Sequence, residues 1–293
     1  QLNKEDIKYI FEYAEKLESI SKGSVRKIPA LRGKTILNYF AEPSTRTRVS
    51  FENAGKILSA DVINMSSSGS SDEKGESLFN SVQTLESIGA NLLVMRHFDA
   101  GAPYFVARNI GIPVINAGDG SHAHPTQNLI DMMTLNEAKI FLQDLKLTIV
   151  GDVSHSRVAR SSVAGFSKMG SNVSICCPDY FKPDAFGEID VQYFEILNEA
   201  LDHSDVVMAL RIQNERLSGE KVDINKYIQR FQITEKLLIE NNIKALLHPG
   251  PLNEDIEVEK NIWKSKNSLI MNQVENGIWM RCAVMIMLMG LEI

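Results

Sequence analysis

Short apolar runs alternate with helical patterns from Lys34 onwards, and this alternation leaves few folds open to the chain. A short apolar run is typical of a buried strand, and helices between such runs are typical of a parallel sheet. The alternation occurs twice along the sequence. We therefore expect an α/β fold with two domains, each a mostly parallel sheet flanked by helices.

Individual strands and helices follow from the same pattern. The first series predicts strands at 35–40, 62–65, 92–95 and 114–116, with helices at about 47–58 and 76–87. The second predicts strands at 147–151, 173–176, 206–210 and 245–247, with a helix lined by Ala159, Val163 and Phe166. The stretch 125–141 would join the two halves, and 281–291 is apolar enough to be a C-terminal helix that packs back on the first domain. We expect domain limits at 1–133, 134–277 and 278–293.

Composition excludes several classes of protein. With 44% apolar residues the 293-residue chain can bury two cores, and it has no apolar run of the roughly 18 residues that cross a bilayer. A formal net charge of −6 gives no general attraction to nucleic acid or anionic membranes. Its three cysteines, two of them adjacent at Cys176 and Cys177, form no disulfide framework, so we expect the cytoplasm. The segment 1–17 lacks the apolar core of a signal peptide, although a trimmed leader stays an alternative.

Three patterns resemble cofactor motifs without completing them. The segment 33–35 looks like the end of a phosphate-binding Walker loop, but Ile28 stands where that motif needs glycine. The segment 118–123 fits a dinucleotide fingerprint, but a proline follows where the helix should begin. His122 and His124 have no partner cluster with metal-ligand spacing. We expect neither a nucleotide cofactor nor a metal.

The segment 40–52, Phe-Ala-Glu-Pro-Ser-Thr-Arg-Thr-Arg-Val-Ser-Phe-Glu, runs from the end of a strand into the start of a helix. Ser44 and Thr45 can cap the helix and donate hydroxyls, while Arg46 adds a cationic fork beside the backbone N–H groups of the first turn. These donors suit a phosphate. A well-capped helix with surface arginines explains the same residues equally well.

Polar side chains also follow the other predicted strands, where ligands bind in open parallel sheets. They are Arg96 and His97, Asp119, His124 and Gln127, Arg157, Arg211 and Gln213, and the segment 248–251. Arginines at four strand ends indicate a site for more than one anionic group. For any single arginine, a solvated ion pair is the alternative.

At this point the sequence resembles a known family, the carbamoyltransferases. The segment 40–52 is similar to their phosphate-binding motif, and 116–120 with 124–127 is similar to their second signature. The segments 211–216 and 248–251 resemble the aspartate-specific branch in particular, and the motifs span the chain in the family's order. The resemblance implies transfer of the carbamoyl group of carbamoyl phosphate to the α-amine of L-aspartate in pyrimidine biosynthesis, without a cofactor or metal.

The resemblance also implies a role for individual residues. Carbamoyl phosphate would contact Ser44, Thr45, Arg46, Thr47, Arg96, His124, Gln127 and the backbone at Pro249 and Gly250, with Arg46, Thr47, Arg96 and His124 as catalytic residues. Aspartate would contact Arg157, Arg211 and Gln213. Ser70 and Lys74, from a Ser-rich loop, would enter the neighbouring subunit's active site, which implies a homotrimer. A plain surface loop is the alternative for that segment. Association with regulatory chains or with dihydroorotase is a further implication.

Some residues depart from the family pattern or keep other interpretations open. Phe98 stands where the family usually has proline, so we expect a changed loop after Arg96. Glu42 and Arg48 are expected to be structural or domain-closing residues. An ornithine-type carbamoyltransferase is disfavoured by Arg211, which stands where that branch has an anion, and by the lack of a cysteine in 248–251. A catalytically silent scaffold subunit and a dinucleotide-dependent oxidoreductase are the remaining alternatives.

Overall fold

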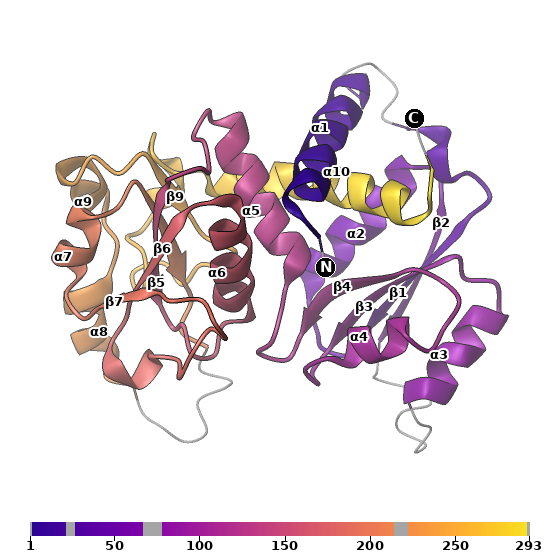
Figure 1. Ribbon diagram of the computed structural model, residues 1–293, viewed down its shortest axis with the longest axis horizontal. Helices are drawn as coiled ribbons and strands as arrows, with labels where there is room; N and C mark the ends of the chain where they lie inside the picture. The colour runs from indigo at the N-terminus through magenta and orange to yellow at the C-terminus, as the bar shows by residue number, and fades with distance from the viewer. Residues whose placement is uncertain (1, 22–26, 67–77, 214–221, 292–293) are drawn as a thin grey trace. The chain divides into compact units, whose positions relative to one another are not determined.

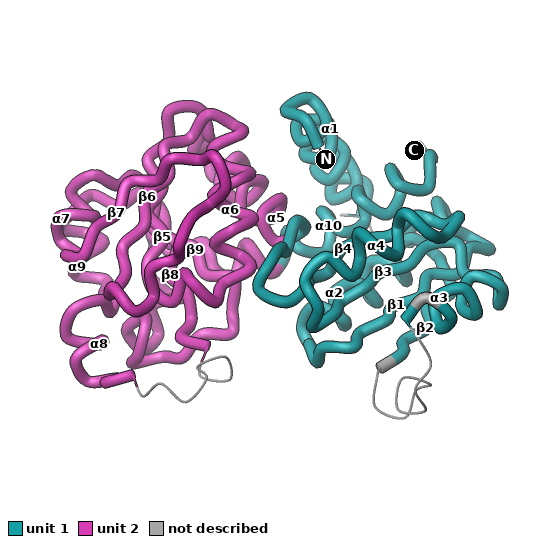
Figure 2. Tube along the Cα trace, turned by 60° about the horizontal axis from the view of Figure 1, so that its bottom comes forward, with its two compact units in different colours: residues 1–126, 275–293 teal, residues 127–274 magenta. Residues whose placement is uncertain are grey.

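The computed structural model describes residues 2–21, 27–66, 78–213 and 222–291. Its contacts divide the chain into two compact units, which Figure 2 shows in different colours. Unit 1 comprises 1–126 and 275–293, and unit 2 comprises 127–274. The expected domain limits, 1–133, 134–277 and 278–293, stay a prediction.

The sheet of unit 1 contains four parallel strands among the described residues, in the order β2-β1-β3-β4. They are β1 (Thr35–Phe40), β2 (Asp61–Ser66), β3 (Leu92–His97) and β4 (Val114–Asp119). The central strands β1 and β3 are almost entirely buried, which explains why they read as continuous apolar runs. Because all four run in one direction, their carboxyl ends lie at one edge of the sheet.

Helices cover both faces of this sheet (Figure 1). Short helices α3 (Leu78–Ser87) and α4 (Ala102–Ala107) close a core that contains Tyr39, Val82, Met95 and Val106. The other face carries α2 (Thr45–Ile57) and the unit 1 part of α10 (Ile270–Leu288), and α1 (Lys4–Ser21) precedes the sheet in the chain. The α10 helix packs on α2, since Arg281 donates to Ser50 Oγ at 2.8 Å and Cys282 Sγ lies 3.6 Å from the carbonyl oxygen of Ala54.

Unit 2 contains a second parallel sheet, with five strands among the described residues in the order β7-β6-β5-β8-β9. They are β5 (Lys146–Gly151), β6 (Asn172–Cys176), β7 (Gln192–Phe194), β8 (Val206–Leu210) and β9 (Ala245–Leu247). Its helices are α5 (Pro125–Glu137), α6 (Arg157–Met169), α7 (Leu197–Asp202), α8 (Ile224–Phe231) and α9 (Glu235–Glu240).

The expected fold class is confirmed, including the return of the C-terminal helix to unit 1. Every strand expected from the sequence is present, within a few residues of its expected limits. The edge strand β7 was not expected, because it has only three residues and its first two are not buried. The α10 helix begins at Ile270, earlier than the expected 281. The sequence did not predict this start because the polar residues Gln273 and Asn276, which are buried, interrupt the apolar pattern seen in the second half of the helix.

Within the described residues, no helix combines the length and the apolar character that a membrane crossing demands.

Candidate active site

In unit 1, the first turn of α2 follows directly from the carboxyl end of β1. Ser44 is the N-cap residue with extended backbone, but among the described residues its hydroxyl does not cap this helix, which corrects the expected role of Ser44 as a side-chain cap. Thr45 and Arg46 are exposed, whereas Thr47 is buried. The first-turn N–H groups of a helix have no intrahelical acceptors and carry partial positive charge. This turn therefore offers the donors that an anion needs.

Arg96 is the penultimate residue of β3, and its guanidinium contacts residues at the ends of both neighbouring strands. Nη2 of Arg96 donates to Oε1 of Glu42 at 2.5 Å, just beyond β1. Nη1 lies 3.5 Å from the carbonyl oxygen of Ala117 on β4. Both charged side chains are largely buried, with 12% of Arg96 and 21% of Glu42 exposed. The pair fixes the arginine in one orientation at the carboxyl edge of the sheet.

Asp119, at the end of β4, organises the turn that leads to His124. Its carboxylate is buried and accepts hydrogen bonds from the backbone N–H of Gly101 at 2.6 Å and of Ala123 at 3.1 Å. Its Oδ2 also pairs with Nδ1 of His122 at 2.9 Å, so this histidine has a structural partner. His124 itself is buried at the start of α5. No group of metal-ligating side chains occurs in the described parts of the chain.

Gly120, in the segment 118–123, allows two loops to pack closely. Gly120 has a φ of +48°, and a Cβ there would lie 2.8 Å from the carbonyl oxygen of Phe98. Glycine thus lets the loop after β3 approach the turn after β4. Phe98 is exposed, and its ring lies 4.3 Å from that of His97. How far Phe98 changes this loop relative to the family stays a prediction.

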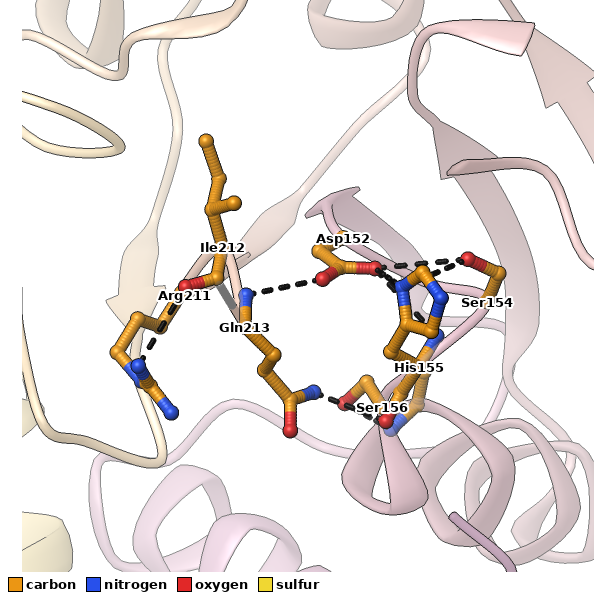
Figure 3. Close-up of polar contacts among 8 residues, drawn as sticks. Asp152, Ser154, His155, Ser156, Arg211, Ile212 and Gln213 are labelled. Atoms are coloured by element: carbon orange, nitrogen blue, oxygen red, sulfur yellow. Dashed lines mark hydrogen bonds and ion pairs between the residues drawn. The ribbon is translucent and has the colours of Figure 1, made fainter. Parts of the chain in front are cut away.

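In unit 2, a polar cluster joins the carboxyl ends of β5 and β8 (Figure 3). Asp152 is fully buried, and its Oδ1 lies 2.8 Å from Nδ1 of His155. Its Oδ2 accepts from the backbone N–H of Gln213 at 3.0 Å, and the side-chain amide of Gln213 donates to the carbonyl oxygen of His155 at 2.9 Å. Asp152 therefore ties the segment after β8 to the loop before α6.

The two arginines expected to bind a dicarboxylate lie on these same segments. Arg157 is the first residue of α6 and is buried, and the helix is capped by Ser156 Oγ, which accepts from the N–H of Ala159 at 3.2 Å. Arg211 follows β8, is half-buried, and directs Nη1 toward the carbonyl oxygen of Ile212 at 3.4 Å (Figure 3). Both arginines thus lie on the two segments that Asp152 ties together.

The last polar segment of unit 2 follows β9. Gly250 has a φ of +68°, and its N–H donates to Nδ1 of the buried His248 at 2.8 Å. Pro249 and Gly250 are half-buried. Gln127, in the first turn of α5, is also buried and belongs to the same unit.

Ser70 and Lys74, which the sequence analysis named, and residues 214–216 of the segment 211–216 lie outside the described residues.

The three cysteines are free and buried, and none is a nucleophile candidate. Burial raises the pKa of the Cys176 and Cys177 thiols to about 12 and also raises the pKa of Cys282. A thiol needs to be ionised to attack a carbonyl or phosphoryl group. These side chains therefore serve as small core residues.

Sequence reasoning missed the buried Asp152 and the half-buried His155, which form the centre of the cluster in unit 2. Asp152 comes directly after the buried strand β5, the same position relative to a strand that singled out Arg96. The position after a strand is therefore a usable signal, but in a sequence a buried aspartate with internal partners cannot be told from an exposed loop aspartate.

Comparison with known families now adds to this geometry. A family model described as aspartate/ornithine carbamoyltransferase, carbamoyl-P binding domain, matches residues 1–137. A second, described as aspartate/ornithine carbamoyltransferase, Asp/Orn binding domain, matches residues 143–288. An aspartate carbamoyltransferase catalytic subunit of Roseiflexus castenholzii is 44% identical over 292 residues, which cover 98% of this chain and 92% of that relative.

Solved structures of both branches share the fold. The catalytic subunit of aspartate transcarbamoylase from M. jannaschii has a TM-score of 0.86 at 30% identity, covering 99% of this chain and 95% of that chain. Ornithine carbamoyltransferase from Thermus thermophilus also has a TM-score of 0.86, at 23% identity and with 98% and 96% covered. The fold alone therefore does not separate the aspartate branch from the ornithine branch.

Proposed function

The chain belongs to the aspartate/ornithine carbamoyltransferase family, and we propose that it transfers the carbamoyl group of carbamoyl phosphate to the α-amine of L-aspartate. The products are N-carbamoyl-L-aspartate and phosphate. The observation that carries the choice of aspartate is the cationic donor set of unit 2, in which Arg157 and Arg211 accompany Gln213. Guanidinium groups suit a substrate with two carboxylates.

Carbamoyl phosphate is assigned to unit 1 residues and to Gln127, Pro249 and Gly250 of unit 2. Its phosphate would bind at the first turn of α2, through Ser44, Thr45, Arg46 and Thr47. The support is the N-terminal position of this turn, where backbone N–H groups and a cationic side chain occur together. The carbamoyl N–H groups would donate to Gln127 and to the backbone carbonyls of Pro249 and Gly250.

The reaction needs no covalent intermediate with the protein. The deprotonated α-amine attacks the carbamoyl carbon, a C–N bond forms, and negative charge grows on the carbonyl oxygen. The C–O bond to phosphate then breaks, and the leaving phosphate takes the proton that the attacking nitrogen loses. Thr47, Arg96 and His124 would donate to that oxygen. Preorganised donors of this kind each contribute about 3 kcal/mol to the transition state. Support for preorganisation comes from the ion pair that holds Arg96.

Aspartate is assigned to unit 2. Arg157, Arg211 and Gln213 would bind its two carboxylates, and Asp152 supports them by holding the backbone of Gln213. Two unit charges 4 Å apart repel by about 4 kcal/mol at an effective dielectric constant of 20. Cationic side chains of the protein that bind each substrate offset this repulsion between two anionic reactants.

Assembly and cellular context belong to the same proposal. By family resemblance, Ser70 and Lys74 would complete the neighbouring subunit's active site in a homotrimer, with regulatory chains or dihydroorotase as further partners. We assign the reaction to pyrimidine biosynthesis in the cytosol, and the three free cysteines support a reducing compartment.

A colorimetric assay for carbamoylated amino acids tests the proposed reaction directly. Purified protein with carbamoyl phosphate should carbamoylate L-aspartate, at a kcat/KM at least 100-fold higher than for L-ornithine. Preferential carbamoylation of ornithine would assign the chain to the other branch. If a trimeric, folded preparation gave no product with either amino acid, the result would indicate a catalytically silent scaffold subunit.

A further inference from the structure

Three buried polar side chains in unit 2 form a continuous chain of hydrogen bonds. The amide nitrogen of Gln127 donates to Oδ1 of Asp131 at 2.7 Å, one turn further along α5. The amide nitrogen of Gln273, at the start of α10, donates to the same Oδ1 at 2.7 Å. Asp131 is fully buried, Gln273 is 4% exposed and Gln127 is 9% exposed. Burying a carboxylate costs free energy unless it is hydrogen-bonded, and the two amide donors to Oδ1 offset part of that cost.

The carboxylate determines which way both amides point. A carboxylate oxygen only accepts hydrogen bonds, so each glutamine has to turn its NH₂ group toward Asp131 and its carbonyl oxygen away. For Gln273 the outcome is visible, because its Oε1 accepts from the backbone N–H of His248 at 2.9 Å. By the same logic Gln127 presents its Oε1 away from Asp131 as an acceptor.

At His248, this series of hydrogen bonds reaches the segment after β9. His248 is buried, and its Nδ1 accepts from the N–H of Gly250 at 2.8 Å. Its Nε2 lies 3.4 Å from Oε1 of the buried Glu257, which accepts from the N–H of Asn253 at 2.5 Å. Gln273 and Glu257 therefore bind the backbone N–H groups of His248 and Asn253, which flank Pro249 and Gly250 in the sequence.

We propose that Asp131 is a positioning residue that selects for the carbamoyl amine. It acts by turning the oxygen of Gln127 toward the substrate and by anchoring, through Gln273 and His248, the carbonyls of Pro249 and Gly250. This inference rests on the proposed function, in which those three oxygens accept the carbamoyl N–H groups. Its consequence is specificity: the site distinguishes an acyl phosphate that carries NH₂ from one that carries CH₃, because only the former can satisfy the aligned acceptors.

A matched pair of stable ligands tests this selectivity. Phosphonoacetamide and 2-oxopropylphosphonate differ only in NH₂ against CH₃ on the carbonyl carbon, and each is measured as a competitive inhibitor against carbamoyl phosphate. The wild-type protein should bind the amide at least tenfold more tightly. Asp131→Leu, which removes the acceptor, should reduce that preference to threefold or less, with the affinity for the methyl ketone unchanged. Asp131→Asn, which keeps one acceptor oxygen, should retain more of the preference than Asp131→Leu.

Two further variants separate positioning from a general loss of structure. Gln273→Met breaks the link to His248 but keeps the bond between Asp131 and Gln127, and it should lower the preference at least threefold. It also decides the matter if Asp131→Leu does not fold. The control is Thr134→Val on the same helix, which removes a buried hydrogen bond to the carbonyl oxygen of Ile130 and should leave the preference unchanged.

The outcomes distinguish this inference from the function on which it rests. If the wild-type protein does not carbamoylate aspartate, the proposed function fails. If it does, and folded Asp131→Leu or Gln273→Met binds both ligands more weakly by the same factor, Asp131 has only a structural role. An unchanged preference in a folded variant likewise overturns the inference.

Discussion

Oε1 of Glu42 and Nη2 of Arg96 are 2.5 Å apart, in an ion pair that joins the segment after β1 to the end of β3. The two residues are 54 positions apart in sequence and meet because β1 and β3 are adjacent parallel strands. The carboxylate holds one arm of the guanidinium, and a fixed orientation suits the role proposed for Arg96 as a donor to the developing oxyanion.

Glu42→Gln should therefore slow the reaction more than it weakens binding. The amide keeps the shape of the carboxylate but loses its charge, and a charge-assisted hydrogen bond is roughly twice as strong as a neutral one. We expect kcat to fall about tenfold, which corresponds to about 1.4 kcal/mol. Steady-state kinetics with aspartate in excess measure it. Glu52→Gln is the control, because Glu52 pairs with Lys56 on the exposed side of α2. Equal effects of the two substitutions would contradict a special role for the pair.

Arg211→Ala should raise the KM for aspartate by roughly 100-fold, about 2.7 kcal/mol, since it removes a charged donor from the carboxylate. The KM for carbamoyl phosphate should change less than threefold. Arg230→Ala is the matched control, because Arg230 is an exposed arginine of the same unit. If Arg211→Ala changed the KM of both substrates equally, Arg211 would not be specific for aspartate.

Asp152→Asn should affect both stability and the use of aspartate. The fully buried carboxylate accepts from the N–H of Gln213 and pairs with His155, and asparagine can replace only one of these acceptor oxygens. We expect the free energy of unfolding in urea to fall by about 1–3 kcal/mol and the KM for aspartate to rise about tenfold. Asp202→Asn, at an exposed position of α7, should change neither. A loss of stability with an unchanged KM would restrict Asp152 to a structural role.

The residues at strand ends were predictable from the sequence, whereas their partners were not. Arg96, Arg211 and His248 were found because each follows a buried apolar run, and strand ends are a local property of the chain. The pairing of Arg96 with Glu42 depends on which strands are neighbours, and strand order is a long-range property. The contact between Asp131 and Gln273 spans 142 positions, so no local pattern announces it.

Buried polar residues were also the main source of error in the elements. No helix was expected over the first half of α10, where the polar residues Gln273 and Asn276 are buried in the structure. A sequence pattern assigns polar residues to the surface by default, and it fails where tertiary hydrogen bonds satisfy them.

The buried thiols should make the protein less stable in alkali. Burial raises the pKa of Cys176 and Cys177 from 9.0 to about 12, so the folded chain keeps both protons where the unfolded chain releases them. The contribution of the two thiols to the free energy of unfolding is therefore fully present below pH 9. It is lost as pH rises toward 12, by up to about 1.4 kcal/mol per pH unit for each thiol. Urea unfolding at pH 8, 9 and 10 measures the slope. Replacement of both cysteines by alanine should make the slope shallower, and an identical slope would contradict this origin.

The effect of Gly165→Ala on stability should change sign when Asn128 is also replaced by alanine. A Cβ on Gly165 of α6 would lie 1.9 Å from Nδ2 of Asn128, which is buried on α5. Gly165→Ala should therefore destabilise the wild-type protein by about 1–3 kcal/mol through overpacking. In a protein that already carries Asn128→Ala the clash is absent, and the same substitution should stabilise by up to about 1 kcal/mol, because alanine favours a helix over glycine. Urea unfolding of the four proteins of this cycle gives both differences. Destabilisation of similar size in both backgrounds would show that close packing against Asn128 is not the reason for glycine at this position.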